Sequence, residues 1–318
     1  MSNPTPRPAK LSDIPFVKDV HFSYGMPDQL SPRISRVIAR NPGPYTYTGS
    51  GTYIIHGPDN DSAAAVIDPG PDLVEHIDAL MAALGPRQVS HILITHTHKD
   101  HCGGARQFAE RCGAPILAYG PHPPPPGLAG APALDEGGDK GFAPDAIIAH
   151  DDAISGNGWT LRALHTPGHL SNHLCFSLEE EKALFTGDHI MGWATTVVAP
   201  PEGSMADYLQ SLDILLERHD TRYYPTHGAP IDQPQRFVRA VRAHRHIRDG
   251  QIMEQLREGR TRINEIVPVM YADVDKRLHI AAALNVFAHL IRMVDIGAVT
   301  CDGPPAMDGT FFIAPAQS

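Results

Sequence analysis

Four side chains of the types that bind metal ions lie within six positions of one another: His96, His98, Asp100 and His101. A short apolar run at residues 92–94, typical of a buried strand, leads directly into them. On an extended chain His96, His98 and Asp100 alternate and would point the same way. His101 would then point elsewhere, so one loop could supply two metals. Because a buried ionised Asp is costly unless it is paired or metal-bound, we expect a metal site here.

Three more candidate ligands follow later in the chain, each at the end of an expected strand or in the loop after it. His169 closes the motif H-T-P-G-H, Asp188 lies in T-G-D-H, and His227 lies in T-H-G. Loops that follow strands can converge on one edge of a β-layered scaffold. We therefore expect these three residues to join the first loop at such an edge.

The seven residues can be divided into two metal sites. Three neutral imidazoles form a zinc site with an open position, and a carboxylate with two oxygens can bridge two metals. Two ions about 3.5–4 Å apart can share a hydroxide, which Asp100 could hold by a hydrogen bond. Zinc is expected, although such ligands also accept manganese or iron. The expected ligands are His96, His98 and His169 for one metal, Asp100, His101 and His227 for the other, and Asp188 between them.

Five further residues are candidates for supporting roles. Asp68 either forms an Asp-Pro-Gly turn or orients a ligating His through its other ring nitrogen. His173 is the candidate proton donor to a leaving group, with a hydrogen-bonded structural His as the alternative. His189 directly follows the expected bridging Asp and could support a ligand. Thr195 and Thr196 could line the substrate pocket.

The expected elements divide the chain into two parts. Up to residue 235, short strands alternate with helices at 73–84 and 105–112, which is typical of a layered α/β domain. A run at 119–145 that is rich in Gly, Ala and Pro is expected to be a surface loop. The second part contains helices at 237–256, 263–270 and 278–294 and strands at 298–300 and 310–313. We therefore predict domains at 1–235 and 236–318, the second a small winged-helix-like α+β domain.

Composition restricts the class of protein. The 318 residues are ordinary for a soluble chain, with a net charge of −10 that lies in the first part, whereas the second part is slightly basic. An acidic protein is a poor fit to non-specific nucleic-acid binding, but the arginines spaced every three residues at 236–248 could follow a phosphate backbone. The four Cys are scattered, the start is polar without a secretory signal, and no apolar run approaches a membrane span, so we expect a cytoplasmic protein.

The motifs T-H-T-H-K-D-H, H-T-P-G-H, T-G-D-H and T-H-G resemble, in that order, the metal motifs of the metallo-β-lactamase-fold hydrolases. The resemblance covers about residues 34–235, and all seven ligand positions of the dinuclear form hold an acceptable residue. It implies a four-layer αβ/βα sandwich with the metals at one edge of the two sheets. The run T-G-D-H-I-M-G-W-A-T-T-V-V and the winged tail look like the lactamase-β-like-protein-2 group.

These resemblances imply different substrates. A characterised member of the lactamase-β-like-protein-2 group is a single-strand RNA endonuclease. Two of the motifs are also similar to those of hydroxyacylglutathione hydrolase, a thioesterase, although the tail here does not resemble that enzyme's glutathione-binding segment. We expect a dinuclear zinc hydrolase that acts on a small carbonyl substrate (a thioester, ester or lactam), with single-stranded RNA as the alternative. A further alternative is a non-enzymatic metal sensor that binds nucleic acid. The apolar helix at 278–294 is either the tail's own core or a homo-oligomer interface.

Overall fold

Two β-sheets face each other in the computed structural model, which describes residues 14–59, 63–123 and 137–315. The first sheet is formed, in order, by β1 (Asp28–Gln29), β2 (Ile34–Ile38), β3 (Gly51–Ile55), β4 (Ala64–Ile67), β5 (Val89–Leu93), β6 (Ile116–Ala118) and β7 (Ala146–Ile147). The second is formed by β8 (Ala153–Gly156), β9 (Trp159–His165), β10 (Leu174–Leu178), β11 (Ala183–Gly187) and β12 (Arg222–Pro225), which lie in the order β12-β11-β10-β9-β8. The centre of the loop expected at 119–145 lies outside the described residues.

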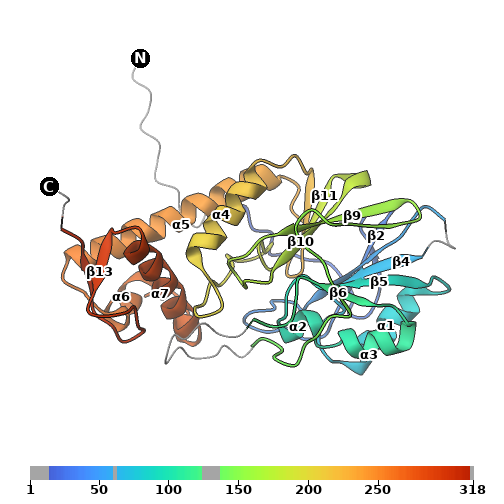
Figure 1. Cartoon of the computed structure of the whole chain (residues 1–318), viewed down its shortest axis with the longest axis horizontal. Coiled ribbons are helices and arrows are strands. Elements are labelled where there is room, and N and C mark those ends of the chain that lie inside the picture. Colours follow the sequence, from blue (N-terminus) through green and yellow to red (C-terminus); the bar gives the residue numbers. More distant parts are fainter. Residues whose placement is uncertain (1–13, 60–62, 124–136, 316–318) are drawn as a thin grey trace, which may run out of the picture.

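Helices cover the outer faces of both sheets and complete four layers (Figure 1). One core cluster joins inward-facing side chains of the two sheets, including Tyr53 and Phe176. A second packs α1 (Val74–Leu84) and α3 (Ala105–Cys112) against the first sheet. A third packs α4 (Met205–Leu216) and the first half of α5 (Pro234–Arg257) against the second sheet. The expected αβ/βα sandwich is confirmed.

The C-terminal elements have a hydrophobic core of their own. The second half of α5 packs there with α6 (Ile263–Met270), α7 (His279–Asp295), β13 (Val299–Cys301) and β14 (Phe311–Ile313). β13 and β14 pair antiparallel, so the predicted helices and two-stranded wing are confirmed. α5 begins at Pro234, next to the predicted boundary at residue 235, but its first half packs in the core of the second sheet and its second half in the C-terminal core. That boundary remains a prediction.

One stretch, Lys276–Asp295, is long and apolar enough to cross a membrane by length and composition alone. Half of it is buried inside the protein, and buried residues of α7 such as Phe287 and Leu290 belong to the C-terminal core. A core helix passes the same test as a membrane span. The contacts of α7 therefore match the expectation that this helix forms the tail's own core.

The first ligand loop differs from the extended chain that its alternating spacing predicted. A single helical turn, α2 (Lys99–Cys102), begins directly after His98. Asp100 and His101 lie on this turn, where neighbouring side chains are about 100° apart rather than on opposite faces. The strand period therefore applies only up to His98, and a helical turn presents the last two ligand candidates.

Candidate metal centre

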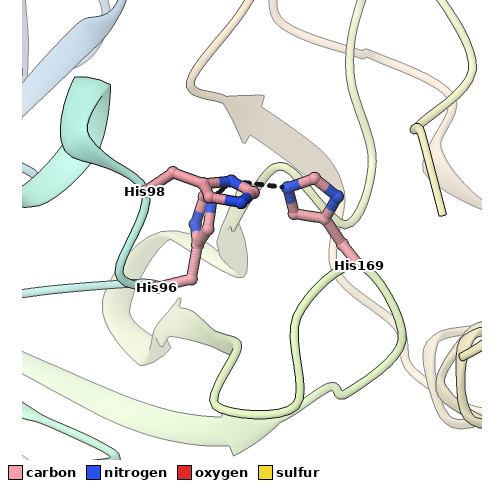
Figure 2. Close-up of side chains that lie close together, drawn as sticks. All are labelled: His96, His98 and His169. Atoms are coloured by element: carbon pink, nitrogen blue, oxygen red, sulfur yellow. Dashed lines mark hydrogen bonds between the residues drawn. The ribbon is translucent and has the colours of Figure 1, made fainter. Parts of the chain in front are cut away.

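Three imidazoles converge on one point at the edge where the two sheets meet (Figure 2). His96 Nε2 lies 2.9 Å from His98 Nδ1, and His169 Nε2 lies 3.1 Å from the same atom. Burial, followed by the neighbouring His169, lowers the pKa of His98 to about 3, and burial also lowers the pKa of the other two. The three rings are therefore neutral at pH 7 and offer lone pairs to a common point.

A second group lies beside the first. Asp100 Oδ2 lies 3.1 Å from His227 Nε2 and 3.3 Å from His101 Nε2, and it accepts a hydrogen bond of 3.0 Å from Ser50 Oγ. All three ionisable side chains are buried. An oxygen and two imidazole nitrogens gathered in this way form a second potential metal site.

Asp188 lies between the two groups. Its Oδ1 is 3.5 Å from His101 Nε2 and 3.4 Å from His227 Nε2, whereas its Oδ2 is 3.8 Å from His169 Nε2. Asp188 Oδ1 and His101 Nε2 are both buried and have no hydrogen-bond partner among the described residues. Buried polar atoms almost always have partners, so two such atoms directed at the same space fit a bound cation. The residues present therefore fit the metal that the sequence predicts.

The charges of this cluster favour a cation for a further reason. Burial lowers the pKa of His101, but the carboxylates of Asp100, Asp188 and Asp68 outweigh that effect, so the pKa is raised well above its usual value. Burial raises the pKa of Asp188, but His227 and His101 outweigh that effect, so it is lowered. The excess of carboxylates around His101 is thus a negative site that either a proton on this ring or a metal ion would neutralise, and a metal would displace the proton.

The ring nitrogens that face away from the centre are held by hydrogen bonds. His169 Nδ1 lies 2.7 Å from the carbonyl of Val197, and His227 Nδ1 lies 3.2 Å from the carbonyl of Gly49. A carbonyl can only accept, so each Nδ1 carries the proton and each Nε2 presents its lone pair to the centre. These contacts fix the tautomer that a metal ligand needs.

Asp68 likewise orients His101 through the ring nitrogen that faces away from the centre, which is one of the two roles expected for it. Its Oδ2 lies 2.8 Å from His101 Nδ1, and its carboxylate also accepts hydrogen bonds from the backbone N–H and the hydroxyl of Thr95, both 2.7 Å long. The carboxylate therefore fixes the start of the ligand loop as well as one ring.

Replacing Asp68 by Asn should lower metal affinity or activity about 10- to 100-fold, because the amide cannot match the negative charge that orients His101. Titration with a competing chelator would measure the affinity. Asp78→Asn, a change to an exposed carboxylate paired with Arg111, is the matched control and should leave the affinity unchanged. Equal affinities for Asp68→Asn and the unaltered protein would contradict this role.

His173 occupies a different place from that expected of a proton donor. Its side chain is fully buried, Nδ1 lies 3.0 Å from the hydroxyl of Thr166, and Nε2 accepts a hydrogen bond of 3.2 Å from the backbone N–H of Asp188. Burial lowers the pKa of this ring well below its usual value. Both ring nitrogens are held by the protein, which favours the alternative of a hydrogen-bonded structural His, and the proton-donor role stays a prediction. In the structural role, His173 positions Asp188.

The other three candidates for supporting roles have different surroundings. Thr195 lines the central pocket. Thr196 is buried, and its hydroxyl donates a hydrogen bond of 2.7 Å to the carbonyl of Asp188, so it fixes the backbone of that residue. His189 is also buried, neither of its ring nitrogens has a hydrogen-bond partner among the described residues, and its ring packs against Tyr208.

A pocket of about 970 Å³ opens onto both metal groups. Asp100 and Asp188 lie in its wall, and most of the remaining wall is apolar, including Phe16 and Met191. The C-terminal domain completes it with residues of α5 and α7 and the loop between α6 and α7. Sequence reasoning missed this wall, although the arginine spacing in α5 was a signal.

Comparison with known proteins decides the family. The model of the metallo-beta-lactamase superfamily matches residues 48–227, more than half of the chain. The chain belongs to the metallo-beta-lactamase superfamily. It is a hydrolase of that superfamily, and residues 263–303 match the beta-lactamase associated winged helix domain.

Relatives of this superfamily member include enzymes with assigned names. An atrochrysone carboxyl ACP thioesterase of Cryptosporiopsis sp. is 31% identical over 73% of the chain, and the match spans 65% of that relative's length. The beta-lactamase-like protein 2 homolog of Caenorhabditis elegans is 30% identical over 86% of the chain and 88% of its own length. A metallo-beta-lactamase family protein of Thermus thermophilus has a TM-score of 0.71 at 24% identity, covering 89% of this chain and 99% of its own, which shows the shared fold.

Proposed function

We propose that this protein is a two-zinc hydrolase of small carbonyl substrates, and of thioesters in particular. The observation that carries the proposal is the pair of ligand groups that share Asp188 at the floor of a largely apolar pocket. Relatives at 31–35% identity are named as thioesterases, and an apolar pocket suits an acyl group better than a polyanion. A small-molecule substrate also agrees with the net charge of −10.

Each ligand group would hold one ion, and the pair would polarise the substrate carbonyl and make water nucleophilic at neutral pH. The protein's own hydrogen bonds would then fix the orientation of the two carboxylates beside the metals. Asp100 lies in the pocket wall, and Ser50 holds one of its oxygens, so its carboxylate is fixed where it can accept a hydrogen bond from the attacking water. Thr196 and His173 hold the backbone of Asp188 from both sides, which keeps that carboxylate between the two groups.

RNA is the less favoured substrate because the arginines of α5 do not form one solvated track. Arg242 pairs with Asp213, Arg245 is buried, and Arg248 faces the pocket. Arg236 and Arg239 are exposed. A phosphate backbone would find few free cations along this face.

The test is hydrolysis of acyl thioesters of N-acetylcysteamine by the zinc-loaded protein, followed as release of free thiol. An end-labelled single-stranded RNA is assayed in parallel. Thiol release that depends on added zinc supports the proposal. Cleavage of the RNA without thiol release would replace it with the endonuclease. Tight metal binding with neither reaction would favour a metal-sensing protein.

We also place the protein in the cytoplasm, where thiols stay reduced. The four cysteines are all free, and Cys102 and Cys175 are buried. Burial raises the pKa of both thiols, so they are poor nucleophiles and poor metal ligands. Fractionation of cells that express the tagged protein would test this placement.

A further inference from the structure

A buried cation without a carboxylate partner lies in the pocket wall that the C-terminal domain supplies. The side chain of Arg245, on α5, is only 3% exposed. It donates to the carbonyl of Thr196 and lies over the ring of Tyr208, 5.0 Å from its centroid, but its Nε is buried without a partner among the described residues. Arg36 is equally buried and its Nε likewise has no partner among the described residues, but its guanidinium forms an ion pair with Asp28, which Arg245 lacks. Burial of a guanidinium without an anionic partner is costly, so the position of Arg245 needs an explanation.

Two further side chains of α5, one of them charged, line the pocket beside Arg245. Arg248 also lines the pocket, 4.6 Å above the ring of Tyr271, and it donates a hydrogen bond to the neutral amide of Gln251 rather than to a carboxylate. His244 also lines the pocket and is neutral, because burial, followed by the two arginines, lowers its pKa to about 3. The three side chains present positive charge and hydrogen-bonding nitrogens to one side of the pocket.

Nearby carboxylates are already engaged elsewhere. Asp249 lies 2.7 Å from His289 and 3.1 Å from Arg292. Glu202, which also lines the pocket, lies 3.1 Å from His122. Among the described residues, no carboxylate therefore forms an ion pair with Arg245 or Arg248.

We propose that Arg245 and Arg248 bind an anionic group, a carboxylate or a phosphate, carried by the substrate at the end remote from the bond that is cleaved. Apolar residues that line the same pocket, including Phe16, Met191 and Leu278, contact the apolar body of the same molecule. Arginine holds such oxyanions with paired, charge-assisted hydrogen bonds. The substrate class is thus an acyl compound with a distal negative charge. The inference rests on the proposed function only for the identity of the reacting bond.

The test measures binding without turnover. Isothermal titration of the zinc-loaded full chain compares octanoate and octyl phosphate with neutral octanamide. Replacing Arg248 by Gln should weaken binding of an anionic probe about tenfold or more and leave octanamide within about twofold. Arg239→Gln, an exposed change on the same helix, is the matched control and should alter neither. Whichever of octanoate and octyl phosphate loses more affinity in the Arg248→Gln variant identifies carboxylate or phosphate as the preferred anionic group.

Arg245→Met separates a binding role from a structural one. A hydrophobic side chain of similar length replaces an unpaired buried cation, so the melting temperature should stay unchanged or rise while anion affinity falls about tenfold or more. Loss of stability without selective loss of anion binding would overturn the proposal. So would unchanged anion affinity in both arginine variants, because the anion would then lie on the metals.

Failure of this inference differs from failure of the proposed function. Arginine-dependent anion binding by a protein that hydrolyses no thioester would retain the anion subsite and reject the thioesterase. Thioester hydrolysis by a protein that binds neutral and anionic probes equally well would retain the thioesterase and reject the anion subsite.

Discussion

Asp188→Ala should abolish hydrolysis, with a loss in kcat/KM of about a thousandfold or more. Asp188 is the one carboxylate among the described residues whose oxygens face both ligand groups, Oδ1 toward His101 and His227 and Oδ2 toward His169. Without it neither group retains its shared ligand, and buried imidazoles face one another with less negative charge between them. Metal content, measured by atomic absorption on the purified variant, should fall in parallel with activity.

The matched control for this variant is Asp213→Ala. Asp213 is half-exposed on α4 and pairs with Arg242 rather than with any ligand candidate. Its replacement should therefore leave metal content and activity unchanged. An Asp188→Ala protein that keeps its metal stoichiometry and its rate would remove Asp188 from the ligand set. The shared-site interpretation would then have to be abandoned.

Removal of the metal should have an equally large effect on activity and a separate effect on stability. Dialysis against a chelator should reduce hydrolysis to the background rate, because a hydrogen bond to Asp100 alone does not lower the pKa of water enough to make it nucleophilic at neutral pH. If the ion is present at about 100 times its dissociation constant, the metal-bound protein is more stable by about 2.7 kcal/mol. For a domain of this size that corresponds to a melting temperature about 5–10 °C lower after chelation.

Readdition of zinc, manganese and iron in separate samples then identifies the ion that restores each property. Recovery of the melting temperature without recovery of activity would indicate an ion that binds but does not support the reaction. A chelated protein that contains no metal yet retains both the rate and the melting temperature would contradict a metal-dependent hydrolase.

Much of the centre could be predicted because metal ligands are rare in cores and their positions relative to strands are regular. His169, Asp188 and His227 each follow a strand of the second sheet, and β11 and β12 are parallel, so the last two necessarily emerge at the same edge. The four-layer arrangement followed from the resemblance, and the helices at 105–112 and 263–270 have the predicted bounds. The spacing of apolar residues within a segment is enough to predict helices of this kind.

What could not be predicted depends on contacts between distant segments. The turn α2 is stabilised by its place beside Gly70, whose backbone bonds to His101, and alternation in the sequence gives no sign of that contact. His173 was considered a proton donor from its position alone, but its burial is set by packing between β10 and the Asp188 loop. The arginine spacing indicated a charged face of α5, but only the packing of α5 in two cores shows that this face lines the pocket.

The two ligand groups draw on both sheets, and this has a consequence for how the chain assembles. His98 and His169, whose nitrogens are 3.1 Å apart, are separated by 71 positions in the chain. Contacts between such distant residues form late in folding, after the costly closure of the intervening loop. A metal ion that needs ligands from both sheets would therefore not nucleate this fold as zinc does in a zinc finger; it would bind after the two halves have met. Bound metal thus reports that the two halves have docked correctly, and half-assembled chains in a cell would be recognisable by its absence.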